Sequence, residues 1–205
     1  MKSKTCYLVL AALCFAILVL VADETSAQAV KGESYRAETP FGGDVKSVSA
    51  RIAAMYSADA PTVERFVQAA INLEGRMGIA APVVIAIAIH ESSFNSELFK
   101  NAGNPFGIQA SKPWVGPSFT KLDNGQQTKF RKYSSAEEAV LDFGNFVKNR
   151  TWYADVFTCP VDDSRCVVDG LKKTDLELGY SMNPNWDESV MQIIQKVRLQ
   201  ELATR

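Results

Sequence analysis

The stretch that decides the fold is residues 82–110, PVVIAIAIHESSFNSELFKNAGNPFGIQA. It begins with an uncharged apolar run, residues 82–89, and His90 and Glu91 follow directly. The valines and isoleucines favour a strand by propensity. The length of about twelve residues, a proline at a first-turn position and the interleaved alanines favour a helix that is apolar on every side and therefore buried. We interpret residues 82–93 as this buried helix, with a strand as the alternative.

Amphipathic helices are expected on both sides of this stretch. Asp44 is placed to cap a first helix that ends near residue 57, and Pro61 opens a second helix with apolar residues at i, i+3, i+4, i+7 and i+8. Further helices are expected after the capping box at Ser135 and Glu138, near residues 166–173, and after Pro184 and Asp187. A polar loop is expected between the helix at residues 82–93 and the turn that begins at Asn104.

A hairpin is the one clear strand signal. Asn124-Gly125 lies between residues 118–123 and 126–133, and this dipeptide is typical of a two-residue hairpin turn. We therefore predict an α+β, mainly α domain over residues 44–205, in which a small antiparallel sheet lies beside a helical core.

The N-terminus has the pattern of a secretory signal peptide, residues 1–27. Lys2 and Lys4 precede an apolar core, and small residues supply a cleavage site near Ala27 or Ala29. An uncleaved membrane anchor is the alternative, because the apolar core is long for a signal and short for a span of roughly 20 residues. Residues 28–43 are polar and Gly-rich, as in a flexible leader. We expect export to the periplasm or the extracellular space.

The remaining cysteines after signal cleavage are Cys159 and Cys166. Two thiols this close in sequence are expected to form one local disulfide in an oxidising compartment, with two buried free thiols as the alternative. The net charge of −1 gives no electrostatic reason to expect nucleic acid or an anionic membrane as a partner. The single histidine argues against a His-based metal site, and we expect no metal and no cofactor.

Glu91 is the leading candidate for catalysis. It is the only acidic residue between Glu74 and Glu97, and it follows the most apolar run outside the signal segment. A carboxylate at the edge of a buried element is a frequent place for a general acid. The alternative is an ordinary solvated glutamate at a helix end.

Aromatic residues form a second candidate group, because their flat faces stack on sugar rings. They are Phe106, Trp114, Tyr133, Trp152, Tyr153, Tyr180 and Trp186. Trp114, between prolines in a loop, is the strongest candidate for sugar binding. Tyr133 and Trp186 adjoin apolar stripes, which favours packing for these two.

Five motifs occur in order between residues 63 and 202. They are Glu91-Ser92-Ser93-Phe94, the NPFGI turn at 104–108, Trp114-Val115-Gly116 with the Asn124-Gly125 hairpin, FRKYSSAEE at 130–138 and GYSMNPNW at 179–186. Together they resemble the motifs of bacterial β-N-acetylglucosaminidases that hydrolyse peptidoglycan, glycoside hydrolase family 73.

The resemblance implies a lysozyme-like helical domain with a small β-lobe and a glycan-binding cleft between them. It implies that Glu91 is the general acid, that Tyr180 positions substrate or water, and that residues 82–93 are a helix. The expected substrate is the glycan strand of peptidoglycan, cut at N-acetylglucosaminyl-β-1,4 bonds. The expected glycan-binding residues are Asn104, Phe106, Trp114, Tyr133 and Tyr153. Recruitment to the cell wall by a protein partner is left open.

The chain departs from the family pattern at the second carboxylate. Many members carry one on the hairpin, where this chain has Lys121 and Gln127-Thr128. Asp123 is the only acidic residue of the hairpin. Three hypotheses follow: Glu91 acts as acid with Asp123 as base; Glu91 acts alone, with the substrate's acetamido group or a muramyl 6-hydroxyl as the attacking group; or the domain binds glycan without cutting it.

Overall fold

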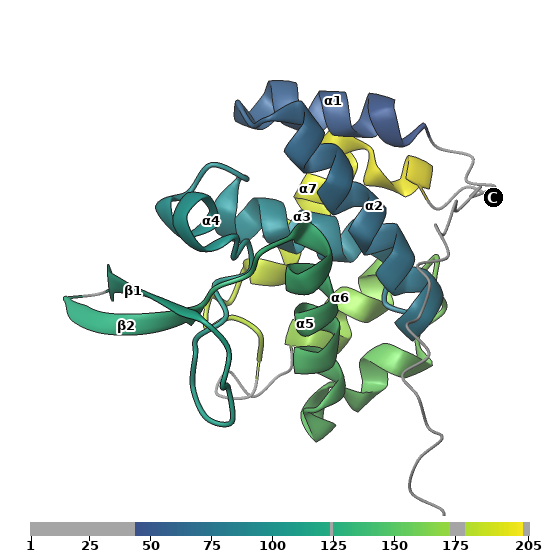
Figure 1. Ribbon diagram of the computed structural model, residues 1–205. Coiled ribbons are helices and arrows are strands. Elements are labelled where there is room, and N and C mark those ends of the chain that lie inside the picture. Colours follow the sequence, from purple (N-terminus) through teal and green to yellow (C-terminus); the bar gives the residue numbers. More distant parts are fainter. Residues whose placement is uncertain (1–43, 124, 173–178, 203–205) are drawn as a thin grey trace, which may run out of the picture. The chain divides into compact units, whose positions relative to one another are not determined.

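The computed structural model of the protein describes residues 44–123, 125–172 and 179–202 (Figure 1). All of them belong to the unit Pro40–Arg205, one of two units into which the chain divides. The predicted signal peptide, 1–27, and leader, 28–43, lie outside the described residues. Within the described ranges, no helix has both the length and the apolar character that a membrane span needs.

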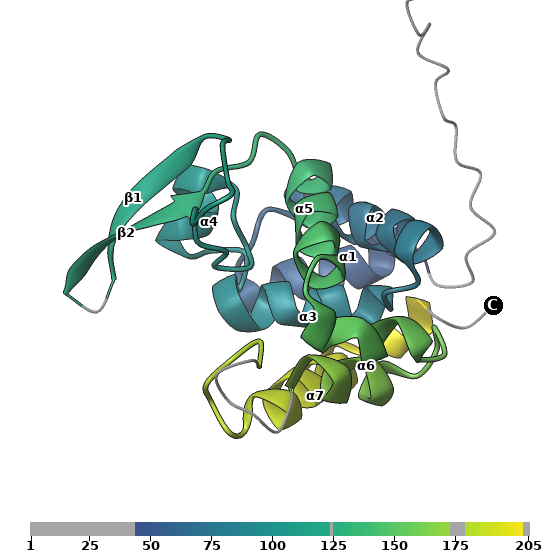
Figure 2. The same cartoon turned by 90° about the horizontal axis from the view of Figure 1, so that it is seen from below.

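Helix α3 (Ala81–Ser92) lies at the centre of the helical body (Figure 1; Figure 2). Every residue from Val83 to Ile89 is at most 1% exposed, so the prediction of a helix buried on all sides is confirmed. The helix begins without a side-chain cap of its own. Instead, the buried carboxylate of Glu74 accepts a hydrogen bond of 2.7 Å from the backbone N–H of Ala81, and its negative charge favours this helix end.

The other helices enclose α3. Those in contact with it are α2 (Ala60–Met77), α6 (Ser164–Lys172), α7 (Trp186–Val197) and the 3₁₀ helix η2 (Leu199–Leu202). Helices α1 (Val45–Tyr56) and α5 (Ala136–Lys148) pack against α2. The predicted caps at Asp44 and Ser135 are confirmed, since each side chain accepts a backbone hydrogen bond from the first turn.

A short helix, α4 (Glu97–Ala102), occupies part of the segment predicted to be a polar loop. Ser96 caps its start, and Gly103 ends it in a left-handed conformation. Leu98 and Ala102 pack with Phe130 in a small apolar cluster apart from the main core. Six residues with so few apolar positions give too little periodicity to predict a helix, and the contact with Phe130 supplies the missing stabilisation.

The predicted hairpin consists of β1 (Ser118–Asp123) and β2 (Gln126–Arg131), paired antiparallel. It lies to one side of the main helical body in both views, with α4 beside it (Figure 1; Figure 2). Two backbone bonds hold its base to residues 108–110, from Arg131 N to Ile108 O and from Ala110 N to Lys129 O. The end nearest Asp123 is therefore the one farthest from this anchored base.

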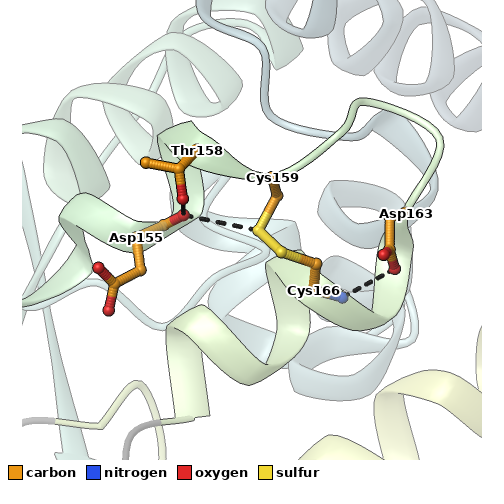
Figure 3. The surroundings of a disulfide bond; sticks show 5 residues. All are labelled: Asp155, Thr158, Cys159, Asp163 and Cys166. Carbon is orange, nitrogen blue, oxygen red and sulfur yellow. Dashed lines mark hydrogen bonds between the residues drawn. A yellow bond between two sulfur atoms is a disulfide. The ribbon is translucent and has the colours of Figure 1, made fainter.

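A disulfide joins Cys159 to Cys166, with Cα atoms 5.7 Å apart (Figure 3), and the predicted pairing is confirmed. Cys159 directly follows the 3₁₀ helix η1 (Thr151–Thr158), and Cys166 lies in the first turn of α6. Asp163 supports that turn by accepting a hydrogen bond from the backbone N–H of Cys166. The disulfide thus links the end of η1 to α6.

The burial of α3 gives a stability prediction for Ile87→Ala. Ile87 is 0% exposed, so the truncation leaves a cavity, and we expect the free energy of unfolding to fall by roughly 2–5 kcal/mol. Urea titration followed by circular dichroism measures it. Leu122→Ala is the matched control, because Leu122 is 65% exposed on the hairpin and should change little. Equal losses for the two variants would contradict the central place of α3.

Candidate active site

Glu91 lies in the last turn of α3. Its side chain lines a cavity of about 360 Å³, here called the first cavity. The side chains of His90 and Glu91 are 25% and 29% exposed, although the residues before them in α3 are buried. The helix thus delivers one carboxylate to the edge of the core, as the sequence predicts. The other cavity walls come from the NPFGI turn, from Phe146 of α5 and from Tyr180 and Ser181.

Two neighbours contact the same oxygen of the Glu91 carboxylate. The indole Nε1 of Trp186 donates a hydrogen bond of 3.3 Å to Oε1, and His90 Nδ1 lies 3.1 Å from it. Trp186 is 1% exposed, so its ring is packed, as predicted, while its N–H also orients the carboxylate. No described residue donates a hydrogen bond to the second oxygen, Oε2. That oxygen is therefore available to a bound molecule.

Tyr180 shares the first cavity with Glu91. Its ring packs against Trp186, with ring centroids 5.3 Å apart, and its hydroxyl donates a hydrogen bond of 3.2 Å to the backbone O of Phe106. Burial raises the pKa of the Tyr180 hydroxyl well above its usual value, and the negative charge of Glu91 adds to the effect. Tyr180 is therefore a neutral hydroxyl at physiological pH.

Asn104 holds together the NPFGI turn, whose residues Phe106, Gly107 and Ile108 line the first cavity. Its side chain, 1% exposed, accepts hydrogen bonds from the backbone N–H groups of Phe106 and Ile108 and donates to the backbone O atoms of Ile108 and Arg131. These contacts use both amide hydrogens and the amide oxygen. Gly107 completes the turn with φ +67°, a left-handed conformation that glycine adopts without strain. Asn104 thus shapes the turn and does not itself line the cavity.

The other predicted glycan-binding residues divide between cavity and core. Phe106 lines the first cavity, although it is 3% exposed and stacks on Phe143 with centroids 4.4 Å apart. Tyr133 is 5% exposed and donates a hydrogen bond of 2.6 Å to Asp142. Tyr153 is 2% exposed and packs against aromatic neighbours. The burial of these two tyrosines favours a packing role.

Trp114 lines a second cavity, of about 760 Å³, which shares Phe146 with the first. Its indole N–H donates a hydrogen bond of 3.0 Å to Pro117 O, and the Arg131 guanidinium lies 4.7 Å from its ring centroid. A side chain at Gly116 would collide with this ring. The loop therefore holds Trp114 in one orientation. Trp152, 38% exposed, lines the same cavity.

Asp123 is the last residue of β1 and pairs with Gln126. It lines neither the first nor the second cavity. Among the described residues, Glu91 is the only carboxylate that lines the first cavity. The structure thus brings Glu91 and Tyr180 together and leaves Asp123 on the hairpin.

Several site residues were not predicted from the sequence. The hydrogen bond from Trp186 and the contact with His90 depend on side-chain geometry that no spacing encodes. The helix face carrying Asp142, Asn145, Phe146 and Asn149 follows the i, i+3, i+4, i+7 pattern and could have been recognised as one wall. Among residues 44–123, 125–172 and 179–202, no group of three or more His, Cys, Asp or Glu side chains is suited to a metal ion.

Asp187 gives a pH prediction for the helix that carries Trp186. Lys172 Nζ lies 2.8 Å from its carboxylate, and this hydrogen bond lowers the pKa of Asp187 below its ordinary 3.8. A lowered pKa in the folded state stabilises the protein above the unfolded-state pKa, and the effect disappears as the pH falls through the folded-state value.

We expect Asp187→Asn to lower the free energy of unfolding by about 1–3 kcal/mol at pH 7. The difference from wild type should shrink as the pH falls from about 4 through the lowered folded-state pKa, below which Asp187 is protonated in both states. Urea titrations between pH 2.5 and pH 7 measure this. A difference that stays constant, or grows as the pH falls, would contradict the ion pair.

Comparison with known proteins places these residues in a family. Residues 67–199 match the glucosaminidase family model, described as mannosyl-glycoprotein endo-beta-N-acetylglucosaminidase. The peptidoglycan hydrolase FlgJ of Salmonella typhimurium is 28% identical over 134 residues, which cover 59% of this chain and 40% of that protein. An N-acetylmuramoyl-L-alanine amidase domain-containing protein of Staphylococcus aureus is 30% identical over 158 residues, 69% of this chain and 25% of that protein. The chain thus spans less than half the length of these relatives.

Solved structures share the fold. A peptidoglycan hydrolase from Sphingomonas sp. A1 superposes with a TM-score of 0.58 at 23% identity, covering 70% of this chain and 93% of that chain. The glycoside hydrolase domain of Salmonella typhimurium FlgJ gives 0.55 at 23% identity, covering 74% and 89%. The predicted lysozyme-like α+β fold is confirmed. The family model spans more than half of the sequence, so the chain belongs to the glucosaminidase family, glycoside hydrolase family 73.

Proposed function

We propose that this protein is a glycosidase that cleaves N-acetylglucosaminyl-β-1,4 bonds in the glycan strands of bacterial cell-wall peptidoglycan. The observation that carries the proposal is the position of Glu91, a single oriented carboxylate at the end of a buried helix, in the cavity that also contains Tyr180. The family of the chain and the peptidoglycan hydrolases among its relatives support the substrate class.

In the proposed reaction Glu91 is the general acid. Its proton passes to the glycosidic oxygen as the C1–O bond breaks, and positive charge develops at C1 of the N-acetylglucosamine ring. The rigid helix and the Trp186 N–H fix the carboxylate through Oε1, which leaves Oε2 for the transfer. Tyr180, as a neutral hydroxyl, positions the sugar or the water. Phe106 and Trp114 are the proposed glycan contacts.

The second group of the reaction is proposed to come from the substrate. The first cavity contains no described carboxylate besides Glu91, which favours the hypothesis that Glu91 is the only protein carboxylate in the reaction. The acetamido oxygen attacks C1 as the leaving oxygen takes the proton. Water then opens the cyclic intermediate at C1 and returns a proton to Glu91, with retention of configuration. For Asp123 to act as base, the hairpin would have to carry the end of β1 into the cavity.

Export is part of the proposal. A peptidoglycan substrate lies outside the cytoplasm, the N-terminal residues have a secretory pattern, and the Cys159–Cys166 disulfide fits an oxidising compartment. We therefore place the protein in the periplasm or the extracellular space. A recruiting partner remains part of the hypothesis, since the net charge of −1 provides no electrostatic tether to an anionic wall.

The test of the acid is Glu91→Gln in an assay of sacculus clearing. The amide keeps the shape of the side chain and cannot donate its proton as an acid, so we expect activity to fall by roughly 10²–10⁴-fold. Glu97→Gln is the matched control, because Glu97 is an exposed residue of α4 outside both cavities. Clearing by Glu91→Gln at the wild-type rate would refute the catalytic role, and binding without clearing by wild type would support a non-catalytic domain.

The same assay tests the second group through Asp123→Asn. We expect this variant to keep activity within about threefold of wild type, because a substrate acetamido group replaces the protein base. A loss comparable with that of Glu91→Gln would show that the hairpin delivers Asp123 to the reaction. Circular dichroism of each variant confirms that the fold is retained.

A further inference from the structure

The second cavity is cationic, although the chain as a whole has a net charge of −1. Its lining includes Lys112, Arg131 and Arg150, and Asp142 is its only carboxylate among the described residues. The aromatic rings of Trp114, Trp152 and Phe146 complete the walls. The combination of aromatic faces and positive charge suits a ligand that is part sugar and part anion.

Arg131 is not available to bind an anionic ligand, because its guanidinium is already paired within the protein. Its Nη1 lies 2.9 and 2.8 Å from the two carboxylate oxygens of Asp142, and its Nε donates to Gln109 O. Tyr133 donates a further hydrogen bond to Asp142. These groups neutralise each other and join the base of the hairpin to α5.

Arg150 is different, because no described carboxylate forms an ion pair with it. One guanidinium nitrogen donates a hydrogen bond of 2.7 Å to Phe146 O, and the guanidinium carbon lies 3.4 Å from the Phe146 ring centroid. This stacking holds the charge at the residue shared by the two cavities. Partial burial lowers the pKa of Arg150, which is still protonated at neutral pH. A partly desolvated cation with unused N–H donors gains from an anionic partner.

We propose that the second cavity binds a carboxylate carried by the muramyl residue next to the N-acetylglucosamine at Glu91, with Arg150 as its main contact. The inference rests on the proposed function. Peptidoglycan strands alternate the two sugars, so the neighbour of the cleaved residue always bears a lactyl group or a stem peptide. Chitin oligomers have no such carboxylate. The cavity would therefore make the enzyme selective for peptidoglycan over neutral chitin chains.

The test measures binding in the Glu91→Gln background, where no ligand is consumed. The probes are soluble glycan fragments with stem peptides, the same fragments after amidase treatment, which exposes the lactyl carboxylate, and neutral chitotetraose. We expect Arg150→Gln to raise the dissociation constant at least tenfold for one or both carboxylate probes and less than twofold for chitotetraose. A loss for the peptide probe alone identifies a stem carboxylate, and a loss for the amidase-treated probe alone identifies the lactyl group.

Control variants keep the test independent of folding. Arg150→Lys should recover part of the affinity, and Arg65→Gln, on α2 beside a different cavity, should change none of the three constants. Lys112→Gln removes another positive charge from the second cavity. Lys112 is exposed, so this variant should weaken carboxylate binding by a smaller factor than Arg150→Gln. Equal effects of Arg150→Gln on all three probes, or no effect of either cavity variant, would overturn the proposal. Sacculus clearing by wild type tests the proposed function separately.

Discussion

The structure depends on the burial of one helix that has no polar side. Because α3 is apolar all round, stability requires other helices to cover it in every direction, and α2, α6 and α7 do so. A polar group can then reach a cavity from α3 only at an end of the helix. Glu91 lies two residues after Ile89, the last buried isoleucine of the helix, so the requirement that organises the core also fixes the position of the carboxylate.

The walls of the two cavities depend on a few buried polar contacts. Asn104 holds its own turn and also donates a hydrogen bond to the backbone O of Arg131, at the end of β2. Arg131 in turn binds Asp142 on α5. Hairpin, turn and helix are therefore joined through side chains that are satisfied within the protein, and buried polar groups of this kind are costly to leave unpaired. The first and second cavities lie side by side because Phe146 forms a wall of both.

Local patterns in the sequence predict much of this fold. Periodicity predicts α2, the capping box predicts α5, and the Asn-Gly dipeptide predicts the hairpin. The apolar run with its glutamate predicts the helix that carries the proposed acid. The limits are also physical. Helix α4 depends on a contact with Phe130, far away in sequence. Tyr133 and Tyr153 have side chains that suit either sugar or core, and only packing decides between them. Arg150 acquires its place from stacking on Phe146, which charge patterning along the chain does not reveal.

The most direct test of the proposed bond specificity is mass spectrometry of sacculi digested by the wild-type protein. Reduction with borohydride before analysis marks the sugar at each new reducing end. We expect new reducing ends on N-acetylglucosamine, because Glu91 is proposed to protonate the oxygen that leaves C1 of that sugar. Products that end in 1,6-anhydromuramyl residues, or new reducing ends on N-acetylmuramic acid, would contradict the proposal.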